Sequence, residues 1–483
     1  MTVTSEGTAP TSGKGPARAG EAEQSTRADR MAMGKDARKS APLESHAEFT
    51  PDPSRDPVGL LLQQAKSRVP ELVPVRHGRM LVSPFTFFRG AALPMAADLA
   101  GTSASGLRAQ LCGDAHLSNF GAFASPERRL VFDVNDFDET LPGPFEWDVK
   151  RLAASLAVAG RDNGLADKDR RQIVLAAAGG YRTAMRAFAE QQFLDVWYAH
   201  LDVDAAIGEY RSAMKAKSVK RTEKLVTQAH TQDSMRALSK LTTVVNGQRR
   251  IVSAPPLIEP IEEIFADERA ETIYKQVRTM LGKYLRSLQS DRKHLLDHYT
   301  LVQVARKVVG VGSVGTRAWI LLMDGGDGTG PFFLQAKEAQ VSVLAAHCGR
   351  SQYRSQGERV IAGQHLMQAE SDIFLGWTCG ADADGVDRDY YLRQLKDWKL
   401  SAPIEQMIPS GMKIYAGMCG WTLARAHARS GDRIALAAYL GGSDKFDQAI
   451  ADYAETYADQ NERDYATFQA AAKDGRAEAT TEI

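Results

Sequence analysis

A β-rich block between two helical regions is the feature that most constrains the fold of this chain of 483 residues. Residues 301–400 contain runs rich in β-branched and aromatic side chains, which favour strands, with one helical pattern between them. Residues 147–300 and the residues after Pro409, up to about residue 472, have mostly helical periodicity. The order helical, β-rich, helical predicts an α+β fold in which most strands come from one stretch of sequence.

Shorter elements are predicted in the first 146 residues. Their patterns indicate helices at 58–66 and 91–100, a strand or turn at 85–88, and buried strands at 107–112 and 130–134. The segment between the two strands has no helical period and is predicted as a loop. Residues 1–55, rich in small, polar and charged residues, predict a mostly disordered tail, and residues 473–483 predict a flexible one.

Charge and cysteine content exclude several classes of protein. Lys and Arg total 60 and Asp and Glu total 60, so the chain lacks the basic excess of a dedicated nucleic-acid binder. The four cysteines contain no CxxC pair, which disfavours a disulfide framework or a zinc ribbon and favours the cytoplasm. No run of 18 apolar residues occurs and the N-terminus lacks an apolar core segment, so neither a membrane span nor a signal peptide is expected.

Two polar loops follow the two early strands. The first, residues 113–119, contains Asp114, His116 and Asn119. An Asp five residues before an Asn can orient a hydroxyl or take its proton, while the Asn oxygen ligates magnesium. The second, residues 132–139, reads FDVNDFDE, and its clustered oxygens favour a cation such as Mg²⁺. The alternatives are an Asx turn for the first loop and a solvated acidic turn for the second.

A glycine motif and a lysine stand in the β-rich block. Residues 310–315 read GVGSVG, and a strand pattern follows them rather than the helix of a dinucleotide-binding turn. No Gly-Lys-Ser/Thr follows, which excludes a Walker A loop. The order strand, glycine loop, strand is typical of a loop that covers nucleotide phosphates, and the alternative is a plain glycine hairpin. Lys337, one hairpin later, is placed to reach such phosphates, or else points to solvent. Helix residues that would hold Lys337 are Glu358, Glu370 and Gln364, and the pattern does not choose among them.

Together these motifs resemble the protein-kinase-like superfamily, in particular its aminoglycoside-phosphotransferase branch. CGDAHLSNFG resembles the catalytic loop of that branch, with Cys112 in place of the usual His, and VNDFDE resembles its metal segment. SPFTFFRGAA, GPFEWDVKRLAAS, KVVGVGSVGTRAWILL and QAESDIFLGW resemble the bacterial family named domain of unknown function 2252.

The order of the motifs departs from that of ordinary kinases, because Asp114, Asn119 and Asp136 precede Gly310 and Lys337. The resemblance therefore implies a circularly permuted, bilobal kinase-like fold. Residues 301–405 would form the nucleotide lobe, and residues 56–300 and 406–472 the helical lobe. Lys337 and Asp136 are then expected to face one cleft.

What the resemblance implies for function is an ATP- and Mg²⁺-dependent phosphotransferase acting on a small molecule. Asp114 would be the catalytic base or hydroxyl-orienting residue, braced by His116. Asn119 and Asp136 would ligate Mg²⁺, with Asp138 as a helper. Nucleotide phosphates would bind Gly310, Gly312, Ser313, Gly315 and Lys337, and Glu358 would hold the lysine.

Two alternatives stay open on the same fold: transfer of an adenylyl group, and a nucleotide-binding pseudokinase that regulates without catalysis. A dinucleotide-dependent oxidoreductase would rest on GVGSVG alone and is disfavoured by the strand that follows it. The four retained residues Asp114, Asn119, Asp136 and Lys337 argue against the pseudokinase.

Overall fold

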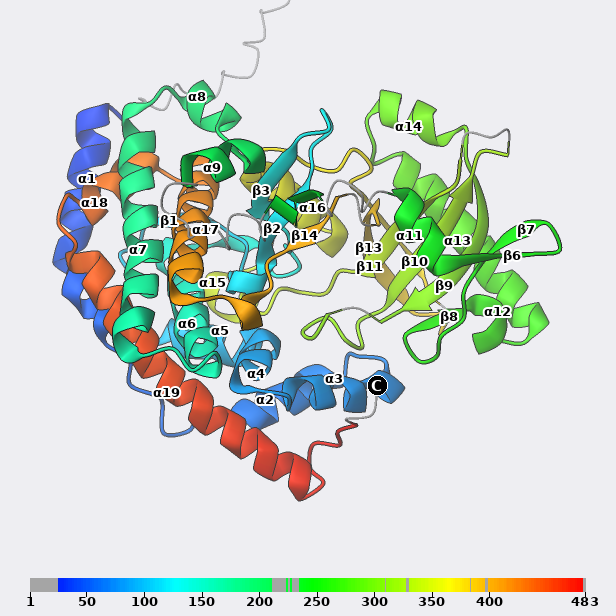
Figure 1. Ribbon diagram of the computed structural model, residues 1–483, viewed down its shortest axis with the longest axis horizontal. Coiled ribbons are helices and arrows are strands. Elements are labelled where there is room, and N and C mark those ends of the chain that lie inside the picture. The colour runs from blue at the N-terminus through cyan, green and yellow to red at the C-terminus, as the bar shows by residue number, and fades with distance from the viewer. Residues whose placement is uncertain are drawn as a thin grey trace, which may run out of the picture.

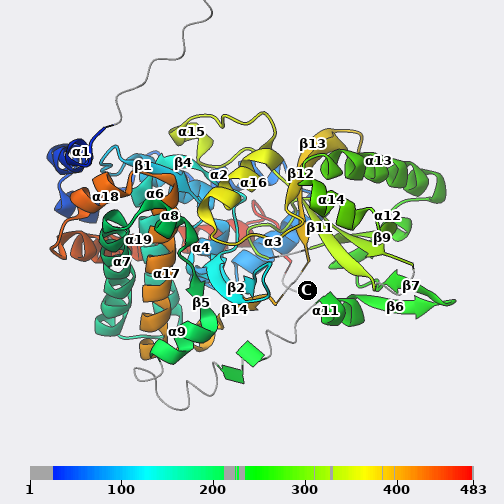
Figure 2. The same ribbon diagram turned by 90° about the horizontal axis from the view of Figure 1, so that it is seen from above.

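The computed structural model describes residues 25–210, 223–224, 226–227, 234–308, 310–326, 330–382, 384–395 and 398–480. Helices gather on one side of the molecule and a large sheet lies on the other (Figures 1 and 2). We call residues 27–210 and 404–480 the helical half, and residues 234–395 the strand-rich half. This mixture of helices and several sheets confirms the predicted α+β class.

The strand-rich half is built on a six-stranded antiparallel sheet in the order β12-β13-β11-β10-β9-β8. Its strands are β8 (Ile258–Pro260), β9 (Thr300–Lys307), β10 (Ala318–Asp324), β11 (Phe332–Glu338), β12 (Gly376–Ala381) and β13 (Asp387–Gln394). One face packs on α13 (Asp267–Leu285) and the other on α11 (Ser234–Leu241) and β7 (Gln248–Ile251), which explains the apolar residues on both faces. Short elements complete this half: β6 (Thr242–Val245), α12 (Ile261–Ile264), α14 (Ser290–Leu296), α15 (Ala345–Cys348) and α16 (Gln356–Met367).

The helical half has one large apolar core, to which the longest helices of the chain contribute. These are α6 (Phe145–Asp162), α7 (Asp167–Glu190), α17 (Pro409–Ser430) and α19 (Lys445–Lys473). Helices α7 and α17 pack side by side, and Gly420 permits their close approach, because a Cβ atom there would lie 2.1 Å from the carbonyl oxygen of Ala177. Segments distant in sequence therefore form one core.

Shorter elements surround that core. They are α1 (Arg27–Ser40), α2 (Pro57–Ala65), α3 (Val73–Met80), α4 (Pro84–Gly90), α5 (Ala92–Ala100), α8 (Phe193–Tyr198), α9 (Val203–Tyr210) and α18 (Arg433–Leu440). A four-stranded sheet, ordered β14-β2-β3-β5, joins β2 (Phe120–Ala124) and β3 (Leu130–Val134) to β5 (Leu201–Asp202) and β14 (Leu400–Ser401). Strands β1 (Arg108–Leu111) and β4 (Leu141–Pro144) form a separate pair. No helix in the described part of the chain is long and apolar enough to cross a membrane.

Several predicted elements are corrected by the structure. The segment predicted as a strand or turn at 85–88 is helix α4, because Pro84 opens it and Ser83 and Thr86 form a capping box. The loop predicted after β1 contains β2, which pairs with β3. The predicted helical region also contains β6, β7 and β8.

The two predicted tails are partly ordered. Part of the N-terminal segment predicted as disordered is α1, whose Arg30 pairs with Asp432. Within the C-terminal segment predicted as flexible, Ala477 is buried and the Thr480 N–H donates to the carbonyl of Pro74. Both segments are ordered by contacts with distant parts of the chain, which composition does not reveal. Parts of the predicted tails and of the predicted helical region, residues 1–24, 211–222, 225, 228–233 and 481–483, lie outside the described residues.

Candidate active site at the meeting of two loops and the large sheet

The two polar loops predicted from the sequence leave the same end of one strand pair. Strands β2 and β3 are antiparallel, with Phe120 opposite Val134, so the loop before β2 and the loop after β3 are neighbours. The N–H of Asn135 donates to the carbonyl of Asn119 at 2.8 Å, one step beyond the last strand pair. The antiparallel pairing therefore brings Asn119 and Asp136 to the same edge.

The first loop is anchored at its start by Asp148 on α6. The backbone N–H groups of Cys112 and Gly113 donate to its two carboxylate oxygens at 2.8 and 3.0 Å. Gly113 has φ of +85°, and a Cβ atom there would lie 2.4 Å from the carbonyl oxygen of Glu139 in the second loop. Glycine is required here because the two loops touch. Cys112, which precedes this glycine, is fully buried.

Asp114 is held in an ion pair that the sequence analysis did not foresee. The Arg151 Nε donates to the Asp114 Oδ1 at 2.6 Å, and the Arg151 side chain is only 3% exposed. Burial raises the pKa of Asp114, and the cationic side chains of Arg151 and Arg89 oppose that rise. The His116 Nε2 is 3.8 Å from the other Asp114 oxygen. The buried arginine fixes this carboxylate in orientation, which suits orienting a hydroxyl.

His116 lies buried beside Asp114. Burial and the neighbouring arginines hold the pKa of His116 well below its usual value, so its ring is neutral. Its Nδ1 has no hydrogen-bond partner among the described residues. The position is compatible with the predicted bracing role.

Lys337 lies at the second loop although it is 199 positions after Asp138. Its Nζ donates to the Asp138 Oδ2 at 2.6 Å and is 4.0 Å from the Asp136 Oδ2. The Tyr391 hydroxyl donates to the other Asp138 oxygen at 2.6 Å. The expected contact between Lys337 and Asp136 is present, and Lys337 is 2% exposed rather than directed to solvent.

The charges of this cluster compensate one another. Burial alone would lower the pKa of Lys337, but Asp136 and Asp138 hold it above its usual value. Burial also raises the pKa of Asp136, as does the neighbouring Asp138. Burial tends to raise the pKa of Asp138 too, but Lys337 and Tyr391 hold it below its usual value. Asp138 is therefore the partner of Lys337, and Asp136 is the carboxylate with the weaker contacts.

The helix residues expected to hold Lys337 lie elsewhere. Among the described residues, the ion pairs of Lys337 are with Asp136 and Asp138, and none is with Glu358. Glu370 lies 3.9 Å from Arg129, and Gln364 donates to Gln368.

Arg359 is the residue of helix α16 that contacts the second loop. Its side chain donates to the carbonyls of Asp138, Thr140 and Gln340 at 2.6 to 2.8 Å. A helix carboxylate was expected to pair with Lys337, but Asp138 of the second loop already does so. An arginine on the helix therefore holds that loop through its backbone.

The glycine loop connects β9 to β10 and touches the helical half. Gly310 and Gly315 have φ of +68° and +85°, which favour glycine at both positions. Arg79 donates to the carbonyl of Gly310 at 2.6 Å, and Arg68 donates to that of Val314 at 2.5 Å. A Cβ atom at Gly312 would lie 3.0 Å from the carbonyl oxygen of Arg89, and the Ser313 carbonyl accepts from Thr316. The loop lies at the same end of the sheet as Lys337, which pairs with Ala318.

A polar cavity of about 530 Å³ lies between the four-stranded sheet and the large sheet. This volume is typical of small-molecule sites. Its lining includes Asn135, Gln335, Gln364 and Gln368, and seven charged residues: Arg128, Arg292, Lys307, Arg393, Lys399, Glu127 and Asp372. The cavity adjoins the second loop at Asn135, so it can hold part of a ligand that reaches Asp136.

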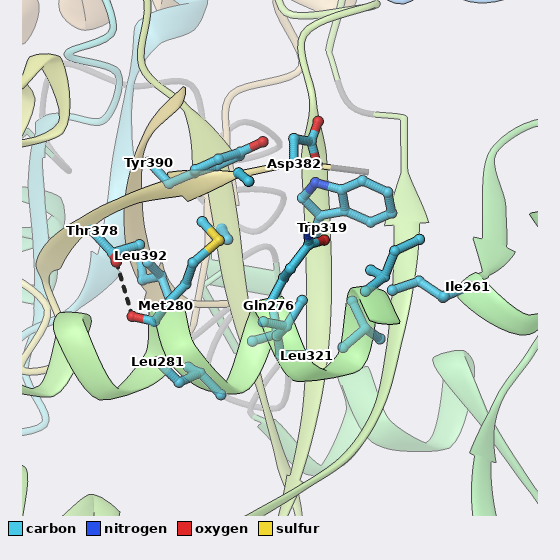
Figure 3. A pocket seen from close by; sticks show the side chains of 15 residues that line it. Ile261, Gln276, Met280, Leu281, Trp319, Leu321, Thr378, Asp382, Tyr390 and Leu392 are labelled. Atoms are coloured by element: carbon cyan, nitrogen blue, oxygen red, sulfur yellow. Dashed lines mark hydrogen bonds between the residues drawn. The ribbon is translucent and has the colours of Figure 1, made fainter. Parts of the chain in front are cut away.

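A second cavity lies between α13 and the opposite face of the large sheet, as Figure 3 shows. Its lining is mostly apolar, with Met280, Trp319 and Leu321 among the side chains, and Thr378 donates to the carbonyl of Met280 at 2.9 Å. Its volume is only about 50 Å³, enough for one or two waters. This cavity is a packing gap rather than a ligand site.

The donors around Asp136 fit a magnesium ion. The Asn119 Nδ2 donates to the Asp114 carbonyl at 2.8 Å, which leaves its Oδ1 as the oxygen able to ligate. The Asp136 carboxylate is 31% exposed, and among the described residues it accepts a 3.2 Å hydrogen bond from the Asp138 N–H and lies 4.0 Å from the Lys337 Nζ. Within the described residues no three His, Cys, Asp or Glu side chains form a metal cage. A site with few protein ligands is what Mg²⁺ with nucleotide phosphates uses.

Comparison with known proteins identifies the family. Residues 68–471 match the model of domain of unknown function 2252, described as an uncharacterized protein conserved in bacteria. Comparison with curated proteins and with solved structures gives no significant match. The chain belongs to this bacterial family.

Proposed function

We propose that this member of the family is a Mg²⁺-dependent phosphotransferase that uses ATP to phosphorylate a small-molecule acceptor. The observation that carries the proposal is the position of Lys337, which follows a strand, glycine loop and strand and lies at the Asp136 and Asp138 carboxylates. A lysine, a metal-binding carboxylate and a glycine loop around one place are the parts that phosphoryl transfer needs.

The fold we propose for this activity is a circularly permuted, bilobal kinase-like fold. Residues 301–405 would be the nucleotide lobe, and residues 56–300 and 406–472 the helical lobe. Two features support the permutation. The polar loops precede the glycine loop in sequence, and the last helices, α17 and α19, pack on α6 and α7.

In the proposed reaction each group has one task. Asp114, held by Arg151, orients the acceptor hydroxyl, and His116 braces the loop. Asn119 and Asp136 hold Mg²⁺, with Asp138 as a helper that fixes Lys337. The ion, when bound, neutralises charge on the phosphates. Lys337 and residues 310–315 position the nucleotide, so catalysis rests on positioning and charge compensation.

The test is an ATP-consumption assay against a panel of metabolites, with products identified by mass. Asp114→Asn should leave ATP affinity within a few fold and reduce turnover by about 10²-fold. Asp384→Asn, on an exposed turn, is the matched control and should keep full turnover. Thermal unfolding of the same preparations excludes loss of fold. Undiminished turnover in Asp114→Asn would show that Asp114 has no catalytic role.

A nucleotide-binding regulator without transfer is the second candidate. The ion pair between Asp114 and Arg151 favours it, because a buried arginine already occupies the carboxylate that would have to contact an acceptor. Mg·ATP binding by the wild type with no transfer of any group would establish this candidate. A product heavier by an adenylyl rather than a phosphoryl group would instead establish the adenylyl transferase.

A further inference from the structure

The polar cavity contains a cation, Arg393, that forms no ion pair with a carboxylate among the described residues. Arg393 on β13 donates from its Nε to the Gln335 Oε1 at 3.2 Å and from one terminal nitrogen to the Asn135 carbonyl at 3.4 Å. Within the described residues no Asp or Glu forms an ion pair with it. A guanidinium has five N–H donors, so three remain for a ligand.

The register of the large sheet places Arg393 beside Lys337 but farther from the glycine loop. Lys337 pairs with Tyr391, and Gln335 pairs with Arg393. Side chains two residues apart on a strand share a face, so Lys337, Gln335 and Arg393 face the same side. Moving away from the glycine loop, Lys337 comes first and Arg393 next, at the wall of the cavity.

The two cations differ in what they can still bind. Lys337 is buried and already contacts Asp138 at 2.6 Å. Arg393 is half-buried, and its hydrogen bonds among the described residues are two long ones to neutral oxygens. Nearby Tyr391, Asp136 and Asp138 outweigh the effect of burial and raise the pKa of Arg393, so the guanidinium stays charged. These carboxylates compensate the charge from a distance, and the N–H donors that remain on the guanidinium can still bind an anionic group.

We propose that Arg393 forms an oxyanion subsite in this cavity, separate from Lys337, that takes a phosphate or carboxylate group of a small-molecule ligand. The subsite rests on the proposed function and extends it, since the group belongs either to the nucleotide or to the acceptor. Cationic residues outnumber acidic ones in the lining, and the Asp372 carboxylate accepts from the Gln394 and Phe374 N–H groups. The guanidinium fork of arginine suits two-point binding of such groups.

The probe is inorganic pyrophosphate, titrated by calorimetry in the presence of EDTA so that no metal site is loaded. Arg393→Gln should weaken pyrophosphate binding at least about tenfold, the equivalent of one charge-assisted hydrogen bond. Arg393→Lys keeps the positive charge but not the guanidinium fork, so its pyrophosphate affinity should lie between those of the wild type and Arg393→Gln. The control is Arg388→Gln on the same strand, whose side chain faces the opposite way and pairs with Asp384, and it should bind as the wild type does.

A second titration, at saturating Mg·ATP, identifies the source of the group. Pyrophosphate binding that persists assigns the subsite to the acceptor, and binding that is abolished assigns it to a nucleotide phosphate. Wild-type affinity in Arg393→Gln, or no pyrophosphate binding by the wild type, overturns the subsite. The proposed function fails separately: a wild type that binds pyrophosphate through Arg393 but transfers no group from ATP keeps the subsite and loses the phosphotransferase.

Discussion

Replacing Lys337 by Met tests whether the charge cluster holds the two halves of the chain together. The substitution keeps the length of the side chain but leaves Asp138 without its cation, which lies 2.6 Å away in the wild type. Breaking a buried ion pair from one side costs about 3–5 kcal/mol. The Asp138 side chain is 26% exposed, so water compensates part of this loss. We therefore expect Lys337→Met to lower the free energy of unfolding by about 3 kcal/mol.

A double-mutant cycle measured by urea unfolding separates this pair from other effects. Asp138→Asn removes the charge that Lys337→Met leaves unpaired, so the double variant should be more stable than the sum of the single losses by about 2 kcal/mol. Lys39→Met, which breaks an exposed pair with Asp36, is the control and should not shift the transition. A coupling below about 0.5 kcal/mol would refute the reasoning, because the lysine and the carboxylate would then act independently.

Three further predictions concern binding, pH and the loop contact. Asp136→Ala should weaken Mg·ATP binding in calorimetric titration more than Asp138→Ala does. Equal binding by wild type and Asp136→Ala, with and without Mg²⁺, would show that Asp136 is not a metal ligand. Burial lowers the pKa of His46 to about 3, so the unfolded chain takes up a proton below about pH 6.5 that the folded chain does not. Urea unfolding should therefore show a stability loss of about 2 kcal/mol at pH 5 relative to pH 7 that His46→Gln lacks, and an equal loss in both would contradict it. Gly113→Ala should lower the melting temperature more than Gly164→Ala, since both have positive φ but only a Cβ atom at Gly113 meets another atom within 4 Å, and equal shifts would argue against the loop contact.

Sequence reasoning succeeded where a pattern is local. Short apolar runs predicted β1 and β3, helical periodicity predicted α2, α5, α6, α7 and α17, and β-branched and aromatic runs predicted most of the large sheet. It failed at residues 85–88, where aromatic residues favour a strand but Pro84 and the capping box of Ser83 and Thr86 start a helix. It also missed β2, because Gly121 and Ala122 carry little strand signal and the pairing with β3 supplies the stability.

The residues of the candidate site that were not predicted from the sequence are arginines. Arg151, Arg359 and Arg393 appear in the sequence as ordinary charged residues of a helix or a strand. Their place in the site depends on tertiary contacts. Arg151 pairs with Asp114, Arg359 donates to the backbone of the second loop, and Arg393 lines the polar cavity. The motif CGDAHLSNFG was a clear signal for its loop, but nothing in it indicates that Arg151 neutralises Asp114.

The sequence by itself determined the class of the fold, the family, and the two polar loops and glycine loop as the places of interest. These depend on neighbouring residues, whose periodicity and backbone requirements are local. Only the tertiary structure decided that Asp138, rather than a helix glutamate, pairs with Lys337, and that Arg393 keeps N–H donors without a partner among the described residues. An ion pair forms only where two side chains lie within a few ångströms of each other, and here they are almost 200 positions apart in sequence. Strand register and helix packing decide which side chains come so close, and no local sequence pattern contains that information.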